Sequence, residues 1–215
     1  MGNYFDDSFN TGVNIPNYLS TLSSRIAKVS DTEISIDSKC NMTFRWSGNT
    51  LNVAIVANGS TIFTGAGGYD YYPQPLVHIF TVISDNLIYF HIYRNTTGGD
   101  TGTRDFAIVY VTDGNNNYFA GGIYNNGVID IHNVSCYNLD TLASGYAFPR
   151  TINFSAPAGN IVYSSISPFT NGGNFAFFVK DVYSCSTVSR GSTIALPNGK
   201  VFVSIGTNAM VEITQ

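Results

Sequence analysis

The chain has 215 residues with a formal net charge of −4, and charged residues make up only 11% of it. An average soluble domain has roughly a quarter. Ten basic residues, spread along the chain without a run, give no patch that could neutralise a phosphate backbone, so we expect no nucleic-acid partner. No apolar run approaches the roughly twenty residues of a membrane-spanning helix, and the start "MGNYFDDSFN" lacks the basic and apolar regions of a signal peptide.

The first thirty residues are predicted to form an N-terminal arm followed by one short helix. In "NIPNYLSTLSSRIAKVS" the apolar residues Leu19, Leu22 and Ile26 recur at intervals of three and four, which predicts a helix over about 16–28, capped by Asn14. The preceding segment carries Tyr4, Phe5 and Phe9 and is too short to fold alone. It should dock either on its own domain or on a neighbouring subunit, and we take these six apolar residues as a candidate attachment arm.

From Thr32 onward the apolar pattern changes to a period of two, which predicts an all-β domain over 31–215. Asn58-Gly59 and Pro197-Asn198-Gly199 predict hairpin turns. Many short strands with turn residues between them favour an antiparallel β-sandwich or barrel, jelly-roll-like. A Gly/Pro/Ser-rich stretch near 141–160 is the best candidate for a boundary between two subdomains, and a long connection within one domain is the alternative.

One strand pattern is apolar on both faces. In "DFAIVYVT", Phe106, Ile108 and Tyr110 alternate with Ala107, Val109 and Val111, so both faces must be covered by a second layer or by another copy of the chain. This pattern favours a homo-oligomer.

The stretch "GAGGYDYYPQPL" places Tyr69, Tyr71 and Tyr72 among glycines and prolines, which predicts a surface loop. Rings on a loop must cover a sugar, a partner subunit or the protein's own core. Because no cluster of Asn, Asp or Trp lies beside them in the sequence, we expect at least two of the three to be buried against protein, most readily at a subunit contact.

The search for catalytic chemistry finds no constellation. His78, His91 and His132 have no second ligand at metal spacing, and the first two read as hydrogen-bonded interior histidines. Asp130 and His132 share a strand face and could orient and polarise a nucleophile, but no serine or cysteine elbow such as G-x-S-x-G accompanies them. The loop with Asp100 and Asp105 lacks the regular order of a calcium site. We therefore expect no enzyme, no cofactor and no bound metal.

The three cysteines Cys40, Cys136 and Cys185 are an odd number without a close pair. The sequence favours buried, reduced cysteines, and one disulfide with a free thiol is the alternative.

The segments "NMTFRWSGNTLNVAIVANGSTIFTG" and "GSTIALPNGKVFVSIGTNAMVEI", in a lysine-poor chain rich in Asn, Tyr and Gly, resemble virion proteins of tailed bacteriophages and prophages. The resemblance covers about residues 32–215, is one of texture, and carries over no functional residue. It implies a structural subunit of the particle: a tail, baseplate, fibre or receptor-binding component, or a capsid-decorating protein.

Such proteins are made in the bacterial cytoplasm, act in the virion and are commonly homo-oligomers, often trimers, so the expected partners are other copies of the chain and other virion proteins. The alternative is a carbohydrate-binding or receptor-binding β module in which tyrosines stack on sugars. The two hypotheses overlap if the virion protein itself binds a host surface glycan.

Overall fold

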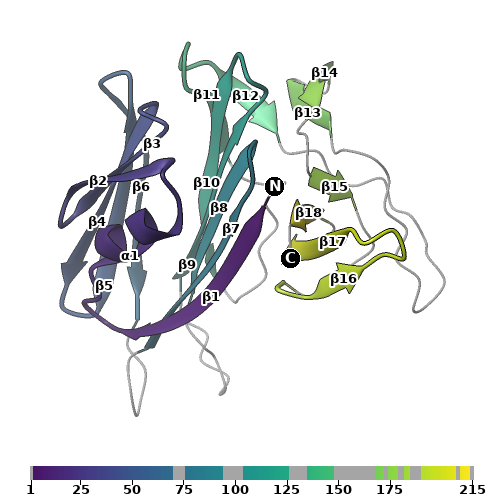
Figure 1. Cartoon of the computed structure of the whole chain (residues 1–215). Coiled ribbons are helices and arrows are strands. Elements are labelled where there is room, and N and C mark those ends of the chain that lie inside the picture. Colours follow the sequence, from purple (N-terminus) through teal and green to yellow (C-terminus); the bar gives the residue numbers. More distant parts are fainter. Residues whose placement is uncertain are drawn as a thin grey trace.

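The computed structural model describes residues 2–69, 76–93, 104–125, 135–147, 168–171, 174–178, 182–184, 190–206 and 209–213. These residues form three antiparallel sheets stacked as layers, with one helix, α1 (Ile15–Leu22) (Figure 1). The all-β, sandwich-like fold expected from the sequence is thus confirmed. The sandwich has three layers, because a large central sheet lies between two smaller ones.

Sheet A, the central layer, has nine strands in the order β1-β7-β8-β9-β10-β11-β12-β13-β14. Their bounds are β1 (Asn3–Asn10), β7 (Leu76–Ile83), β8 (Leu87–Tyr93), β9 (Arg104–Thr112), β10 (Asn117–Asn125), β11 (Ser135–Asn138), β12 (Ser144–Ala147), β13 (Pro168–Asn171) and β14 (Asn174–Phe178). Sheet B has the order β2-β3-β4-β5-β6 and sheet C the order β15-β18-β17-β16. Their bounds are β2 (Ile26–Ser30), β3 (Glu33–Ile36), β4 (Cys40–Ser47), β5 (Thr50–Ala57), β6 (Ser60–Gly68), β15 (Val182–Ser184), β16 (Thr193–Ala195), β17 (Val201–Gly206) and β18 (Ala209–Ile213).

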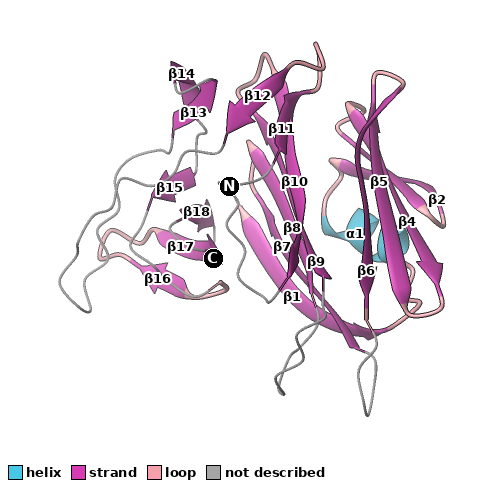
Figure 2. Cartoon of the chain, turned by 180° about the vertical axis from the view of Figure 1, so that it is seen from behind, coloured by secondary structure: helices cyan, strands magenta, loops and turns pink. Residues whose placement is uncertain are grey.

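Two apolar cores lie on opposite faces of sheet A. Side chains alternate between the faces of a strand, so in β9 Phe106, Ile108 and Tyr110 join the core that also contains sheet B and α1. Ala107 and Val109 point the other way, into the core shared with sheet C. The two-faced apolar strand is therefore covered on both sides by its own chain (Figure 2), and this pattern no longer argues for an oligomer.

The predicted hairpin turns are present. Asn58 and Gly59 have φ values of 46° and 74°, the positive values that a type I′ turn requires at both central positions, and they join β5 to β6. Between β16 and β17, Gly199 has a φ of 82° and its amide donates to Leu196 O at 3.0 Å.

Helix α1 is shorter than the sequence predicted. The Asn14 side chain accepts a hydrogen bond from the Asn17 amide at 2.8 Å, which caps the helix as expected. The helix ends at Leu22 because Ser23 is extended, with φ −160° and ψ 143°. Ile26 lies in strand β2, so its predicted place on the helix face was wrong. It is 2% exposed and fills the sheet B core from the strand.

The predicted N-terminal arm is the edge strand β1 of sheet A. It pairs with β7 over its full length, from Asn3 opposite Ile83 to Asn10 opposite Leu76. Of the two dockings that the sequence left open, the structure shows the one on its own domain. Just before β1, Gly2 lies where sheets A and C come close, since a Cβ there would lie 2.8 Å from the carbonyl oxygen of Glu212 in β18 and 3.0 Å from that of Ile83 in β7.

The subdomain boundary expected near 141–160 stays a prediction, because residues 148–160 lie outside the described residues; the described strands pass from sheet A to sheet C between β14 and β15. Of that stretch, residues 141–147 are described, and they lead through a turn into β12, which belongs to sheet A. Strands β13 and β14 extend sheet A further, and only β15 starts sheet C.

Candidate functional site

A cluster of aromatic and charged side chains lies on the face of sheet A that is turned towards sheet C. We call it the histidine cluster: His78, His91, Tyr93, Asp105 and Arg190. His91 and Tyr93 alternate along β8, and His78 lies opposite Tyr93 on β7, so the three rings share one face. The Tyr93 ring stacks on His91 at 4.8 Å and on His78 at 5.1 Å, while the Arg190 guanidinium lies 4.0 Å from its centre.

His91 is the most deeply buried member of the cluster. Its side chain is fully buried and its Nε2 lies 3.6 Å from Oδ2 of Asp105, longer than a hydrogen bond. Among the described residues neither ring nitrogen of His91 has a hydrogen-bond partner. Burial lowers the pKa of His91 to about 4, even though the Asp105 carboxylate favours the charged form, so the ring is neutral at pH 7. The sequence placed His91 inside the protein correctly, but the expected hydrogen bonds are absent from the described part of the chain.

His78 contacts a hydroxyl group that could act as a nucleophile, that of Ser8. The Ser8 hydroxyl lies 2.8 Å from Nδ1 of His78, and the two residues are cross-strand partners of β1 and β7. A serine–histidine dyad also needs an acceptor that orients the second ring nitrogen. Nε2 of His78 has no such partner among the described residues. Burial lowers the pKa of His78 as well. The contact therefore holds β1 on β7 and lacks the third group of a catalytic triad.

Several sequence candidates for chemistry lie outside the described residues: Asp100, Asp130, His132 and Cys185. Asp105, expected in a loop, lies in β9 and is 5% exposed, facing His91. The described residues contain no group of three or more His, Cys, Asp or Glu side chains able to hold a metal ion. Cys40 and Cys136 are buried free thiols, as the sequence favoured, and burial raises the pKa of Cys40 to about 12.

Tyr69 is a core residue of its own chain. Its ring is fully buried, lies 5.6 Å from Trp46 in an edge-to-face arrangement, and donates its hydroxyl to Ile92 O at 3.3 Å. Burial raises its pKa well above the usual value. The expected burial against protein is correct for this ring, which therefore belongs to neither a sugar site nor a subunit contact. Tyr71 and Tyr72 lie outside the described residues.

The residues of the candidate attachment arm are mostly occupied within the chain. Phe5 and Phe9 pack against the core between sheets A and B, and so does Leu22. Leu19 is fully buried there. Of these six residues, Tyr4 alone is exposed, at 41%. The apolar side chains that the sequence assigned to an attachment arm are therefore largely buried within the chain itself.

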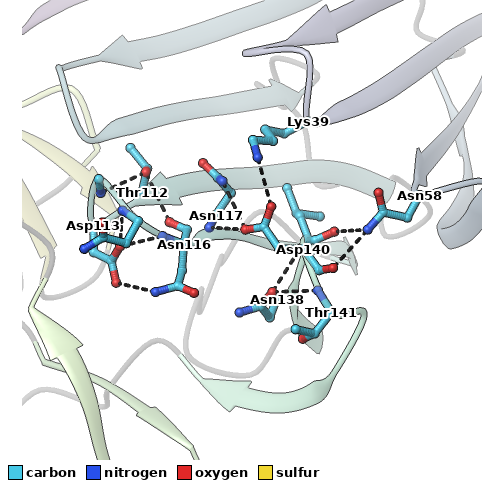
Figure 3. A network of polar contacts seen from close by, with 12 residues as sticks. Lys39, Asn58, Thr112, Asp113, Asn116, Asn117, Asn138, Asp140 and Thr141 are labelled. Atoms are coloured by element: carbon cyan, nitrogen blue, oxygen red, sulfur yellow. Dashed lines mark hydrogen bonds and ion pairs between the residues drawn. The ribbon is translucent and has the colours of Figure 1, made fainter.

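A polar network ties sheets A and B together at one end (Figure 3). Asp140, just after β11, accepts hydrogen bonds from the Asn117 amide and side chain at 3.0 and 3.1 Å and pairs with Lys39 at 3.0 Å. From the β5–β6 turn, Nδ2 of Asn58 donates to the carbonyl oxygens of Leu139 and Asp140 at 2.9 and 3.1 Å. Burial disfavours the charge, but the bonds from Lys39 and Asn117 prevail and lower the pKa of Asp140. The network fixes the layers relative to each other.

The outer face of sheet B carries a hollow of about 470 Å³. Two rows of side chains cross β4, β5 and β6 there, and the lining comprises Thr43, Arg45, Asn52, Val53, Ala54, Thr64, Gly65 and Ala66. The hollow exists because Ala54 and Ala66 are small between longer neighbours. Arg45 is exposed and has no ion pair among the described residues. The lining has no aromatic ring.

Strand β6 is a long sheet edge of the described residues that carries neither a charge nor a proline, although a bulge at Ile62 interrupts its pairing with β5. Proteins usually block edges with charges, prolines or short strands. Edge β1 carries Asp6 and Asp7, and edge β2 carries Lys28. Edges β14, β15 and β16 have three to five residues. Strand β6 has nine residues, "STIFTGAGG", without charge or proline. No hydrogen bond joins its backbone to the backbone of any described residue outside β5.

The sequence interpretation missed this edge because it assigned the glycines from Gly65 onward to a loop. Gly65 to Gly68 instead complete β6, opposite Val53 to Thr50 of β5. An uncharged run of nine residues after an Asn-Gly turn is the signal that could have revealed it. The histidine cluster could not be assembled from the sequence, because its cross-strand contacts depend on the register of three strands.

Comparisons with known proteins give no relative: no family model, no curated protein and no solved structure matches the chain. The one helix in the described part of the chain has eight residues, which is too short to cross a membrane.

Proposed function

We propose that the chain is a structural subunit of a bacteriophage virion, in a tail, baseplate, fibre or capsid-associated position, and that it assembles with further copies of itself and with other virion proteins. The observation that carries the proposal is the edge β6, nine residues long and without charge or proline. A freely diffusing protein with such an edge risks aggregation, whereas a subunit of an assembly uses it as a contact. The layered architecture and the low charge of the chain agree with a rigid building block. The resemblance of the sequence to phage virion proteins is the reason for proposing a virion as the assembly.

The proposal is tested on particles. Phage particles from a bacterial lysate in which the chain is detected are purified by density gradient, and their peptides are identified by mass spectrometry. The chain should co-purify with the particles at a fixed ratio to the major capsid protein, and immunogold labelling should place it at one location. A chain that is abundant in the lysate and absent from the particles would refute the proposal.

The second candidate is a carbohydrate-binding or receptor-binding module, and the hollow on sheet B favours it. Thr43, Asn52 and Thr64 offer hydroxyl and amide groups for sugar hydroxyls, and Arg45 offers a cation for an acidic sugar. The missing aromatic platform is the argument against it, since sugar faces commonly stack on rings. Binding of the purified chain to a glycan array, abolished by Arg45→Ala and retained in Ala27→Lys on the far edge of the sheet, would favour this candidate.

A further inference from the structure

We propose that β6 pairs antiparallel with β6 of a second copy around a twofold axis at Thr64, so that two five-stranded sheets B form one continuous sheet. This inference rests on the proposed function and deepens it, because it names the partner and the register of the contact.

The backbone supplies the pairing potential. Strand β6 is bonded to β5 on one side, and its other side presents amide and carbonyl groups without backbone partners among the described residues. Ser60, Thr61 and Thr64 are exposed side chains along this edge. Unpaired backbone groups of an edge strand are a template for a further strand, and each bond that forms removes one unsatisfied group.

The side chains favour a second copy as the occupant. A twofold contact brings each residue near its own counterpart or near its mirror position, so any charge on the strand would meet a like charge. Strand β6 has none. The edges β1 and β2 would each bring their own charges, Asp6, Asp7 and Lys28, into such a contact.

Register follows from residue size. With the axis at Thr64, the centre of the nine residues, Thr64 faces Thr64 of the partner, and Phe63 faces Gly65. Threonine pairs are favourable across antiparallel strands. The Phe63 ring is half-buried at the edge of the core, 6.4 Å from Phe119. Opposite a glycine, an aromatic side chain can cover the bare backbone. Shifting the axis by one residue in either direction would break the match between Phe63 and Gly65.

The axis is twofold, whereas the resemblance to virion proteins implies trimers. The two symmetries are compatible only in an assembly that contains both axes. The purified chain alone should therefore form a dimer or a multiple of a dimer.

A cysteine at the axis tests the register. Residues directly opposite each other in antiparallel strands have Cα atoms about 4.5 to 5.5 Å apart, within the range of a disulfide. Thr64→Cys should crosslink to itself under mild oxidation. Thr61→Cys is the matched control: it is exposed on the same strand and would lie about 20 Å from its counterpart. Wild type, carried through the same oxidation, gives the background of the three native cysteines.

A charge on the edge tests the contact itself. Thr64→Lys should shift the purified protein from dimer to monomer in light scattering, at least tenfold in the dissociation constant, because two lysines would face each other. Ala27→Lys adds the same charge to the exposed opposite edge of the same sheet and should leave the mass unchanged. Far-UV circular dichroism and Trp46 fluorescence check that each variant is folded.

The outcomes separate the two claims. A Thr64→Cys crosslink with monomeric Thr64→Lys supports the pairing even if the chain is absent from particles. A chain that is present in particles but stays monomeric when pure, or that crosslinks through Thr61→Cys and not through Thr64→Cys, overturns the pairing and leaves the virion role standing.

Discussion

Mild acid should destabilise the protein through His91. Burial lowers the pKa of this histidine to about 4 in the folded protein, against 6.5 for an unperturbed side chain. Because the folded pKa is the lower one, the unfolded chain takes up a proton first as the pH falls. The stability from neutral His91 is complete above pH 6.5 and is lost as the pH falls towards 4. The loss is about 3 kcal/mol in full and about 2 kcal/mol at pH 5.

The assay compares urea unfolding at pH 7.5 and pH 5.0, followed by the fluorescence of Trp46, the single tryptophan. His91→Gln removes the titrating group, so the difference in unfolding free energy between the two pH values should shrink by about 2 kcal/mol, whatever the absolute stability of the variant. Asp140 and Glu212, whose carboxyl pKa values are lowered by hydrogen bonds despite partial burial, lose their contribution at lower pH and in both proteins alike.

His78→Gln is the matched control on the neighbouring strand. His78 is only half-buried and keeps its contact with Ser8. Burial lowers its pKa too, so its replacement should reduce the pH dependence in the same direction but by less. If His91→Gln retains the full pH dependence of wild type, the buried neutral imidazole is not its source and the reasoning is refuted.

Three substitutions test the other contacts. Asp140→Ala removes the charged acceptor that joins sheets A and B, and should lower the unfolding free energy by about 2 kcal/mol. Asp31→Ala, at an exposed ion pair, should change it little. Equal effects of the two substitutions would contradict the role of Asp140 in joining the sheets. Tyr69→Phe loses the bond to Ile92 O and should cost about 1 kcal/mol without altering oligomer mass. Asn14→Ala should cost about 1 kcal/mol through the lost cap, and Ser20→Ala on the same helix should not. Urea unfolding measures the free energies of these variants, and light scattering measures the oligomer mass.

The strands of the central sheet could be predicted from the sequence because their local pattern and their environment agree. The apolar runs around Phe80, Phe90 and Ile108 are buried on both faces, and β9 begins one residue before the predicted strand "DFAIVYVT" and ends with it. What covers the two faces was not predictable. The period of a strand shows that both faces are apolar, but says nothing of whether the cover comes from the same chain.

The errors in the sequence interpretation come from tertiary contacts that override local preference. The helical spacing of apolar residues extends from Leu22 to Ile26, but Ile26 lies in a strand because β2 pairs with β3, where Ile26 is opposite Ile36. The segment with Phe5 and Phe9 was expected to dock, but the sequence left its partner open, because the strand β7 on which it pairs lies some seventy residues away. Glycines at 65–68 favour a loop locally, yet pairing with β5 holds them extended.

Hydrogen–deuterium exchange of β6 tests the central claim most directly. Amides of residues 60–66 that point away from β5 are without backbone partners among the described residues. They should exchange rapidly in the dispersed Thr64→Lys monomer and become protected in the wild-type assembly, while β2 at the opposite edge exchanges alike in both. Equal exchange of β6 in the assembled and the dispersed protein would contradict the proposal that this strand is the assembly edge.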